Sequence, residues 1–337
     1  MLKTAEAVSI GHPDKTADYI SSYILDRFIE QDPDVRYAVE VMLKGNNVIL
    51  GGEITSQVHL KSFDEYVKQA LREIGYDENY YKIWDDKAIN IQKINLINLI
   101  GQQSPEINHG IMQNGWGDQG VFAGYACQGK GHINSELFYA RKLNQALYNK
   151  AKDSQNLGLD IKTQITLDET GHITTAIAAV PMLKQENLND FIRDILNQSP
   201  DEIIVNGTGI YQTHSSVADC GVTGRKLACD FYSTACPVGG GSPWTKDPSK
   251  ADLTLNLYAR HLAVKNLQNN DECFVYLSSC IGQCKLPSGV IKTIKNGHIH
   301  YQNFDCTLKP KELIQKLGLN QPIYARLCQK GLTFSVD

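Results

Sequence analysis

The order of strands and helices limits the possible folds more than any other feature of this sequence. Over residues 35–43 every second residue is apolar, residues 44–47 have turn composition, and residues 48–55 return as a second strand. Apolar residues at three- and four-residue steps then predict a helix over 63–74. Two paired strands followed by one helix predict a sheet that is covered on one face.

A similar order of elements recurs twice. Residues 159–167 and 172–180 flank an Asp-Glu-Thr-Gly turn, and a helix is expected at 186–197. A third unit is expected to begin with a strand at 202–205 and to contain further strands at 225–232 and 273–278 and a helix at 251–266. We therefore expect an α+β fold of three similar sheet-plus-helix domains, although no sequence repeat of fixed period is present.

The stretch 101–120 is rich in Gln, Asn and Gly and has no periodicity. Long connections of this kind often serve as lids or binding loops. We expect an N-terminal α+β domain, a lid-like loop, a central α+β domain and a C-terminal α+β domain, at residues 1–103, 104–114, 115–215 and 216–337.

Composition excludes several classes of protein. A net charge of −4 gives no general attraction to nucleic acid or to anionic lipid, and no apolar run approaches the length of a membrane span. The nine cysteines lack the density of a disulfide scaffold, and only Cys280 and Cys284 approach the spacing of zinc ligands, with no second pair to complete a site. We expect a soluble cytoplasmic protein with reduced thiols and no nucleic-acid or membrane partner.

Two glycine motifs resemble nucleotide-binding signatures but lack the context that those signatures need. GWGDQG, residues 115–120, matches G-x-G-x-x-G, yet polar residues precede it and a strand follows it, so a sharp turn is the better interpretation. GVTGRK, residues 221–226, fails as a Walker A motif because Asp219 occupies the position of the first glycine.

Charged residues of both signs gather beside glycine turns. In GHPDKTADYI, residues 11–20, an imidazole, a carboxylate and an ammonium precede an expected amphipathic helix over 16–30. Lys162 is expected to share a strand face with Asp160. The turn 219–226 ends in Arg-Lys, and GGGSPWTKDPSKAD, residues 239–252, adds two lysines and two aspartates.

Each of these charges, taken alone, is typical of a solvent-facing side chain. In combination they suit a magnesium polyphosphate, because Lys and Arg bind phosphate oxygens while isolated aspartates suit Mg²⁺. On this interpretation His12 and Lys15 face phosphate and Asp14 binds the metal.

Seven motifs in order resemble the S-adenosylmethionine synthetase (methionine adenosyltransferase) family over essentially the whole chain: GHPDK at 11–15, GGEIT at 51–55, QSPEIN at 103–108, GDQG at 117–120, KTQ at 162–164, DCGVTGRK at 219–226 and GGG...KDPSKAD at 239–252. The resemblance implies that the sulfur of methionine attacks the ribose 5′ carbon of ATP and displaces tripolyphosphate, which is then hydrolysed to pyrophosphate and phosphate. A neutral thioether has no proton to lose, so the first step needs no general base.

The resemblance also implies roles for individual residues. The catalytic, polyphosphate-holding set is His12, Lys162, Arg225, Lys226 and Lys246. Further ATP contacts are expected from Asp118, Asp160, Tyr211, Asp219 and Ser242, and methionine contacts from Glu53, Gln103, Asp219 and Lys250. Two Mg²⁺ ions per site are expected, with Asp14 and Asp252 as ligands, and K⁺ is expected at Glu40.

Family members build each site from two subunits, so the resemblance implies a homodimer, or a tetramer of paired dimers. This chain departs from the family pattern at Ile10, Ile210, Val238 and His214-Ser-Ser216, where the family usually has Glu, Arg, His and a glycine-rich run. The connection between residues 110 and 115 also looks shorter than the family's lid. Two other functions stay open: a catalytically silent nucleotide-binding homologue, and a tripolyphosphatase.

Overall fold

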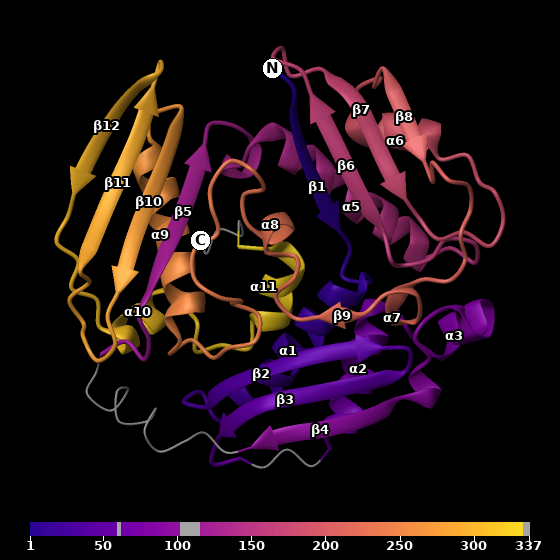
Figure 1. The fold of residues 1–337 in the computed structure, drawn as a ribbon, viewed down its shortest axis with the longest axis horizontal. Coiled ribbons are helices and arrows are strands. Elements are labelled where there is room, and N and C mark those ends of the chain that lie inside the picture. Colours follow the sequence, from indigo (N-terminus) through magenta and orange to yellow (C-terminus); the bar gives the residue numbers. More distant parts are fainter. Residues whose placement is uncertain (59–61, 102–114, 333–337) are drawn as a thin grey trace.

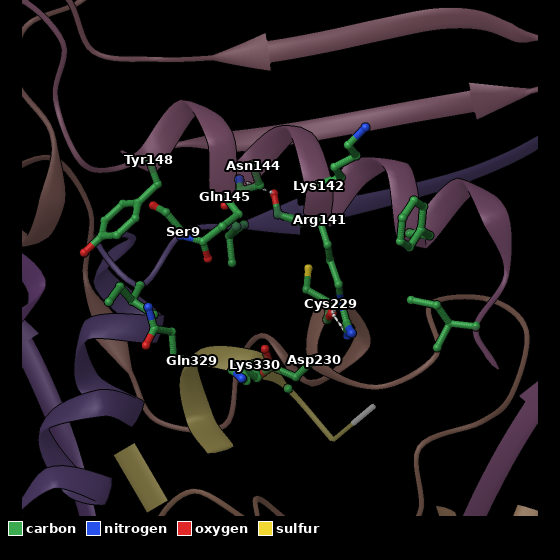
Figure 2. Close-up of a pocket in the computed structure, with 16 residues that line it drawn as sticks. Ser9, Arg141, Lys142, Asn144, Gln145, Tyr148, Cys229, Asp230, Gln329 and Lys330 are labelled. Atoms are coloured by element: carbon green, nitrogen blue, oxygen red, sulfur yellow. Dashed lines mark hydrogen bonds between the residues drawn. The ribbon is translucent and has the colours of Figure 1, made fainter. Parts of the chain in front are cut away.

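The computed structural model describes residues 1–58, 62–101 and 115–332 (Figure 1). Its strands are β1 (Lys3–Val8), β2 (Arg36–Lys44), β3 (Asn47–Thr55), β4 (Asn95–Gly101), β5 (Gly120–Cys127), β6 (Lys162–Leu167), β7 (Ile173–Ala179), β8 (Glu202–Val205), β9 (Gly221–Val222), β10 (Glu272–Ser279), β11 (Ser288–Lys295) and β12 (His298–Asn303). Its α-helices are α1 (Pro13–Ile29), α2 (Phe63–Ile74), α3 (Glu78–Trp84), α5 (Ser135–Lys152), α6 (Asn189–Leu196), α7 (Ser215–Ala218), α8 (Leu227–Asp230), α9 (Ala251–Leu267), α10 (Pro310–Lys316) and α11 (Tyr324–Lys330).

Three four-stranded sheets are arranged around a common centre (Figure 1). Their strand orders are β9-β2-β3-β4, β1-β6-β7-β8 and β5-β10-β11-β12. Each sheet thus consists of three strands that are consecutive in the sequence and one edge strand from elsewhere, which pairs antiparallel in every case. The expected α+β fold of three similar units is confirmed.

Each edge strand lies in the sheet of a different unit from the one whose expected sequence range contains it. β1 lies in the sheet of the central unit, β5 in that of the C-terminal unit, and β9 in that of the N-terminal unit. The domain ranges stay a prediction, but the sheets themselves are interleaved. Residues of one unit are therefore held beside residues of another by backbone hydrogen bonds.

One long helix covers the junction between each edge strand and its sheet. α1 packs on β2 and β9, α5 on β1 and β6, and α9 on β5 and β10. α1 also contacts α2 and α11, and every one of its residues except Arg27 is buried. The amphipathic character expected for this helix was wrong, because neighbouring units cover the face that would otherwise meet solvent.

Most of the expected elements are confirmed within a few residues, including β2, β3, α2, β6, β7, α6, α9 and β10. The strand expected at 225–232 was wrong, since that stretch holds the short helix α8 and turns. β8 runs parallel to β7 and closes the central sheet instead of opening the third unit. Helix α5 was not among the expected elements.

Two expectations from composition concern the cysteines and the helices. All nine cysteines are free thiols, as expected. In the described ranges, no helix combines the length and the apolar character that crossing a lipid bilayer would require.

Candidate active site

The N-terminus of α1 forms the centre of the candidate site. His12 caps this helix, because its Nδ1 accepts a hydrogen bond from the Asp14 N–H at 3.2 Å. Nδ1 is therefore unprotonated and Nε2 carries the proton. Burial, together with the charge of Lys226, lowers the pKa of His12 to about 3. The imidazole is thus a neutral hydrogen-bond donor at neutral pH.

Asp14 ties the turn 219–226 to the start of α1. Its carboxylate accepts hydrogen bonds from the Val222 N–H at 2.9 Å and from the Lys226 ammonium at 2.6 Å. The Arg225 guanidinium lies 3.7 Å away. Burial opposes ionisation of Asp14, but these hydrogen bonds outweigh it and lower the pKa of the carboxyl. The two cations of the turn are therefore fixed beside one buried carboxylate.

Asp160 and Lys162 approach the same place from the central sheet. Lys162 is exposed at the start of β6, and its charge acts on both His12 and Asp160. Burial raises the pKa of Asp160 to about 7, and a hydrogen bond of 2.9 Å from the Ser215 N–H opposes that rise. Tyr211 lies near enough to Asp160 for the two groups to interact electrostatically, and burial raises the pKa of its hydroxyl.

The glycine-rich segment 239–252 carries a second ion pair, between Lys246 and Asp252. The Gly241 N–H also donates to Asp252, at 2.9 Å. Gly240 has a φ of 71°, and a Cβ there would lie 2.6 Å from Asp252 Oδ1, so the close approach requires glycine. A Cβ on Gly224 would lie 2.9 Å from the Cβ of Ser242, so this segment touches the turn that carries Arg225 and Lys226.

Glu40 joins the same two segments from β2. Its carboxylate accepts hydrogen bonds from the hydroxyl of Thr223 and, at 3.1 Å, from that of Thr245. Glu40 pairs with Gly51, and Glu53 pairs with Ala38, so both glutamates lie on one face of the β2–β3 pair. The carboxylate and two hydroxyls that meet here supply oxygen atoms, which is the donor type that hard cations prefer.

Both ends of this chain match one protein family. Residues 1–105 match the S-adenosylmethionine synthetase N-terminal domain, and residues 213–335 match the S-adenosylmethionine synthetase C-terminal domain. An S-adenosylmethionine synthase of Wolinella succinogenes is 31% identical over 362 aligned positions, which cover 98% of this chain and 92% of the relative. The chain belongs to the S-adenosylmethionine synthetase family. An "unusual S-adenosylmethionine synthetase" from Campylobacter jejuni has a similar structure, with a TM-score of 0.88 at 31% identity, over 98% of this chain and 94% of that one.

The structure brings most of the predicted site residues of this S-adenosylmethionine synthetase family member together, and their individual roles stay predictions. One group is formed by His12, Asp14, Asp160, Lys162, Tyr211, Asp219, Arg225 and Lys226, and the adjoining segment adds Ser242, Lys246 and Asp252. Glu53, Asp118 and Lys250 make no hydrogen bond to either group in the part of the chain that the structure describes. Gln103 and the expected lid at 104–114 lie outside the described residues.

Lys15 does not face the candidate site, contrary to expectation. Its ammonium lies 2.6 Å from Asp230 and 3.2 Å from Asp18, and 5.0 Å from the centre of the Trp244 ring. Burial disfavours the ammonium, but the charge of Asp230 outweighs it and raises the pKa of Lys15. Sequence spacing offers a signal for Asp18, one helical turn away, but none for Asp230, which is 215 residues distant.

The residues that depart from the family pattern have three different surroundings. Ile10 is buried, whereas Ile210 and Val238 are partly exposed apolar residues. His214 is buried, and Ser215 donates its N–H to Asp160. The replaced glycine-rich run therefore contributes a direct contact to the candidate site.

The carboxylates can be tested as cation ligands by their chemistry. Within residues 1–58, 62–101 and 115–332, no three His, Cys, Asp or Glu side chains come together as a metal cage. Asp14 and Asp252 each stand instead beside lysines of the candidate site. Single carboxylates of this kind fit Mg²⁺ that takes its other ligands from phosphate and water.

Proposed function

We propose that this protein synthesises S-adenosylmethionine from ATP and L-methionine, as a methionine adenosyltransferase. The observation that carries the proposal is the convergence of His12, Asp14, Lys162 and Lys226 from three interleaved units on the N-terminus of one buried helix. A helix N-terminus favours anions, and the lysines and Arg225 add charge there. A polyphosphate is the anion that such a spread of cations suits.

In the proposed reaction the methionine sulfur displaces the whole tripolyphosphate from the ribose 5′ carbon. Negative charge gathers on the leaving group, so His12, Lys162, Arg225, Lys226 and Lys246 act by stabilising it. His12 donates its Nε2 proton as a hydrogen bond without becoming charged, since its pKa is about 3. No group on the protein has to take a proton from the thioether.

The ion pairs of the free protein suggest how the site accepts a charged substrate. Lys226 pairs with Asp14, and Lys246 pairs with Asp252. Bound magnesium polyphosphate would offer phosphate oxygens to Lys226 and Lys246 and a cation to Asp14 and Asp252. Every charge then stays compensated throughout the exchange, which limits the desolvation penalty.

Asp14 and Asp252 would hold Mg²⁺, and Glu40 with the hydroxyl oxygens beside it would hold K⁺. When bound, these cations neutralise charge on the polyphosphate. Glu53, Gln103, Asp219 and Lys250 are proposed to bind methionine, and Asp118, Asp160, Tyr211 and Ser242 the nucleotide. Tyr211 offers an aromatic face on which a base can stack.

We also propose a homodimer with sites between its subunits. The β2–β3 face that carries Glu40 and Glu53 continues into exposed apolar side chains at Met42, Ile97 and Leu99. An exposed apolar sheet face beside charged site residues is typical of a protein interface. The molecular mass from gel filtration distinguishes monomer, dimer and tetramer.

A cytoplasmic location belongs to the same proposal, because nine free thiols suit a reducing compartment.

One assay separates this function from its two alternatives. Purified protein is incubated with ATP, methionine, Mg²⁺ and K⁺, and adenosylmethionine, pyrophosphate and phosphate are quantified. The proposal predicts the sulfonium product together with pyrophosphate and phosphate. A parallel reaction is supplied with inorganic tripolyphosphate. Phosphate release there by a protein that makes no sulfonium product would identify a hydrolase, and the absence of products from both reactions would identify a silent homologue.

A further inference from the structure

His214 lies in a buried aromatic cluster behind the candidate site. Its side chain is enclosed by Tyr80 and Trp84, whose rings stand edge-on to the imidazole at centroid distances of 5.9 Å and 4.7 Å. Nε2 lies 2.5 Å from the Tyr80 hydroxyl, and Nδ1 lies 2.7 Å from the carbonyl oxygen of Gln212. Both nitrogens of this histidine therefore have partners.

The donors and acceptors at either end of this cluster, the Leu159 N–H and the Gln212 carbonyl, fix the direction of each hydrogen bond between them. The Gln212 carbonyl can only accept, so Nδ1 carries the proton and Nε2 is an acceptor. Tyr80 must then donate its hydroxyl proton to Nε2. The same hydroxyl oxygen accepts a hydrogen bond from the Leu159 N–H at 3.1 Å. A relay thus runs from the Leu159 N–H through Tyr80 to His214.

The relay ends at the residue before Asp160. Leu159 is held on its other side as well, because its carbonyl oxygen accepts the Ser9 hydroxyl at 2.6 Å. On the far side of Asp160, the residue after His214 donates its N–H to the carboxylate at 2.9 Å. The backbone next to Asp160 and the carboxylate itself are therefore both fixed by the His214-Ser215 pair.

The close approach of these segments depends on a glycine. A Cβ on Gly158 would lie 3.0 Å from His214 Nε2 and 2.7 Å from the Cβ of Pro181. Glycine at this position gives the imidazole room to meet Tyr80.

The geometry points to His214 as a positioning residue: through Tyr80 and Leu159, and through Ser215 beside it, His214 sets the place of the Asp160 carboxylate against the nucleoside part of the nucleotide. The inference rests on the proposed function, because it needs Asp160 at the nucleotide. It concerns a segment in which this chain departs from the family's glycine-rich run. The polyphosphate end of the site is connected to Leu159 less directly, through Ser9, whose hydroxyl donates to the Leu159 carbonyl and whose own carbonyl accepts the His12 N–H at 3.0 Å.

The test compares two relay variants with a matched control. His214→Phe keeps an aromatic ring beside Trp84 but removes both hydrogen bonds, and Tyr80→Phe removes only the hydroxyl. Tyr148→Phe serves as the control, since it also deletes a buried hydroxyl, one that donates to the Ile74 carbonyl at 2.5 Å outside the relay. His214→Gln can still accept the Tyr80 hydroxyl proton and is the conservative variant.

Initial rates are measured against ATP and against methionine, together with hydrolysis of inorganic tripolyphosphate, which has no nucleoside. We expect His214→Phe and Tyr80→Phe to raise the KM for ATP about 10-fold, the effect of losing a buried hydrogen bond. The kcat, the KM for methionine and tripolyphosphate hydrolysis should stay close to those of Tyr148→Phe. His214→Gln should recover much of the loss.

An unchanged KM for ATP in both relay variants of an active enzyme would overturn the positioning inference alone. Equal losses of tripolyphosphate hydrolysis and of adenosylmethionine synthesis would also overturn it, because a general structural defect affects both reactions. A wild-type protein that makes no adenosylmethionine would instead overturn the proposed function, and the inference would fall with it.

Discussion

Two groups of ion pairs near α1 use the same residue types under different conditions. The buried cluster consists of Lys15, Asp18 and Asp230, and the exposed fraction of the Lys15 side chain is 2%. The open pairs are Lys226–Asp14 and Lys246–Asp252, whose lysines are 17% and 23% exposed.

The difference between the groups lies in what can replace each partner. In the buried cluster Trp244 also donates to Asp230, at 2.8 Å, and the Gly224 N–H donates to Asp18, also at 2.8 Å. These groups are buried, so an incoming ligand cannot replace their bonds in the folded protein. The cluster therefore fixes the turn 219–226 against α1. The lysines of the open pairs reach solvent and can exchange a carboxylate for a phosphate. Burial, more than charge, therefore separates the structural lysine from those proposed to bind phosphate.

The largest expected effect concerns the buried cluster. Lys15→Met leaves two buried carboxylates without their cation, so the free energy of unfolding should fall by about 3–5 kcal/mol. Urea denaturation measures this change. Lys3→Met, on an exposed lysine of β1, should stay within about 0.5 kcal/mol of wild type. Equal stability of the two variants would remove the distinction between the groups.

Removing an exposed lysine of the candidate site should lower the activity strongly and the free energy of unfolding very little. Lys162→Ala is expected to lower the rate of adenosylmethionine formation about 10²- to 10³-fold, because one preorganised contact to the leaving group is lost. The free energy of unfolding should change by no more than about 0.5 kcal/mol, since Lys162 is exposed. A normal turnover number would contradict the place given to this residue.

A smaller effect is expected at the carboxylate of the second open pair. Asp252→Asn keeps the shape of the side chain but removes its charge, so the Mg²⁺ concentration at half-maximal activity should rise about 10-fold. Asp190→Asn, on a 93% exposed aspartate of α6, is the matched control. If both variants titrate with Mg²⁺ like the wild type, Asp252 is not a metal ligand.

The smallest expected effect is a dependence on pH. Burial raises the pKa of Asp160 to about 7, so the carboxyl is largely protonated below this pH and ionised above it. The ionised form is the stronger hydrogen-bond acceptor and has no O–H donor, so the KM for ATP should fall several-fold as the pH rises from about 6 to about 8. Asp160→Asn should lack this dependence. His12 should add no titration near pH 6.5, because its pKa lies near 3.

Local patterns predicted much of the fold. Alternation and helical spacing located β2, β3 and α2 because each is formed by contacts between residues close in the sequence. The same patterns could not assign a strand to a sheet. β1, β5 and β9 pair with strands that are distant in the sequence, and the alternation of side chains does not depend on which partner a strand finds.

The candidate site was predictable as a set of residues but not as an arrangement. Glycine turns beside cations indicate a polyphosphate ligand through residue type and spacing alone. The relay through Tyr80 and His214 was not predictable, since its members lie 134 residues apart and a buried histidine has no local signature. Lys15 was misplaced for the same reason, because its deciding partner, Asp230, comes from a distant segment.

The sequence by itself determined the family, the order of the elements and the chemical types gathered in the site, since these depend on residue identity and spacing. The tertiary structure decided which of two neighbouring charges in GHPDK, Asp14 or Lys15, faces the site. It also decided that each sheet contains an edge strand from another unit. The physical reason is that the free energy of a charge depends on its burial and its partners, and both are fixed only when distant segments pack together.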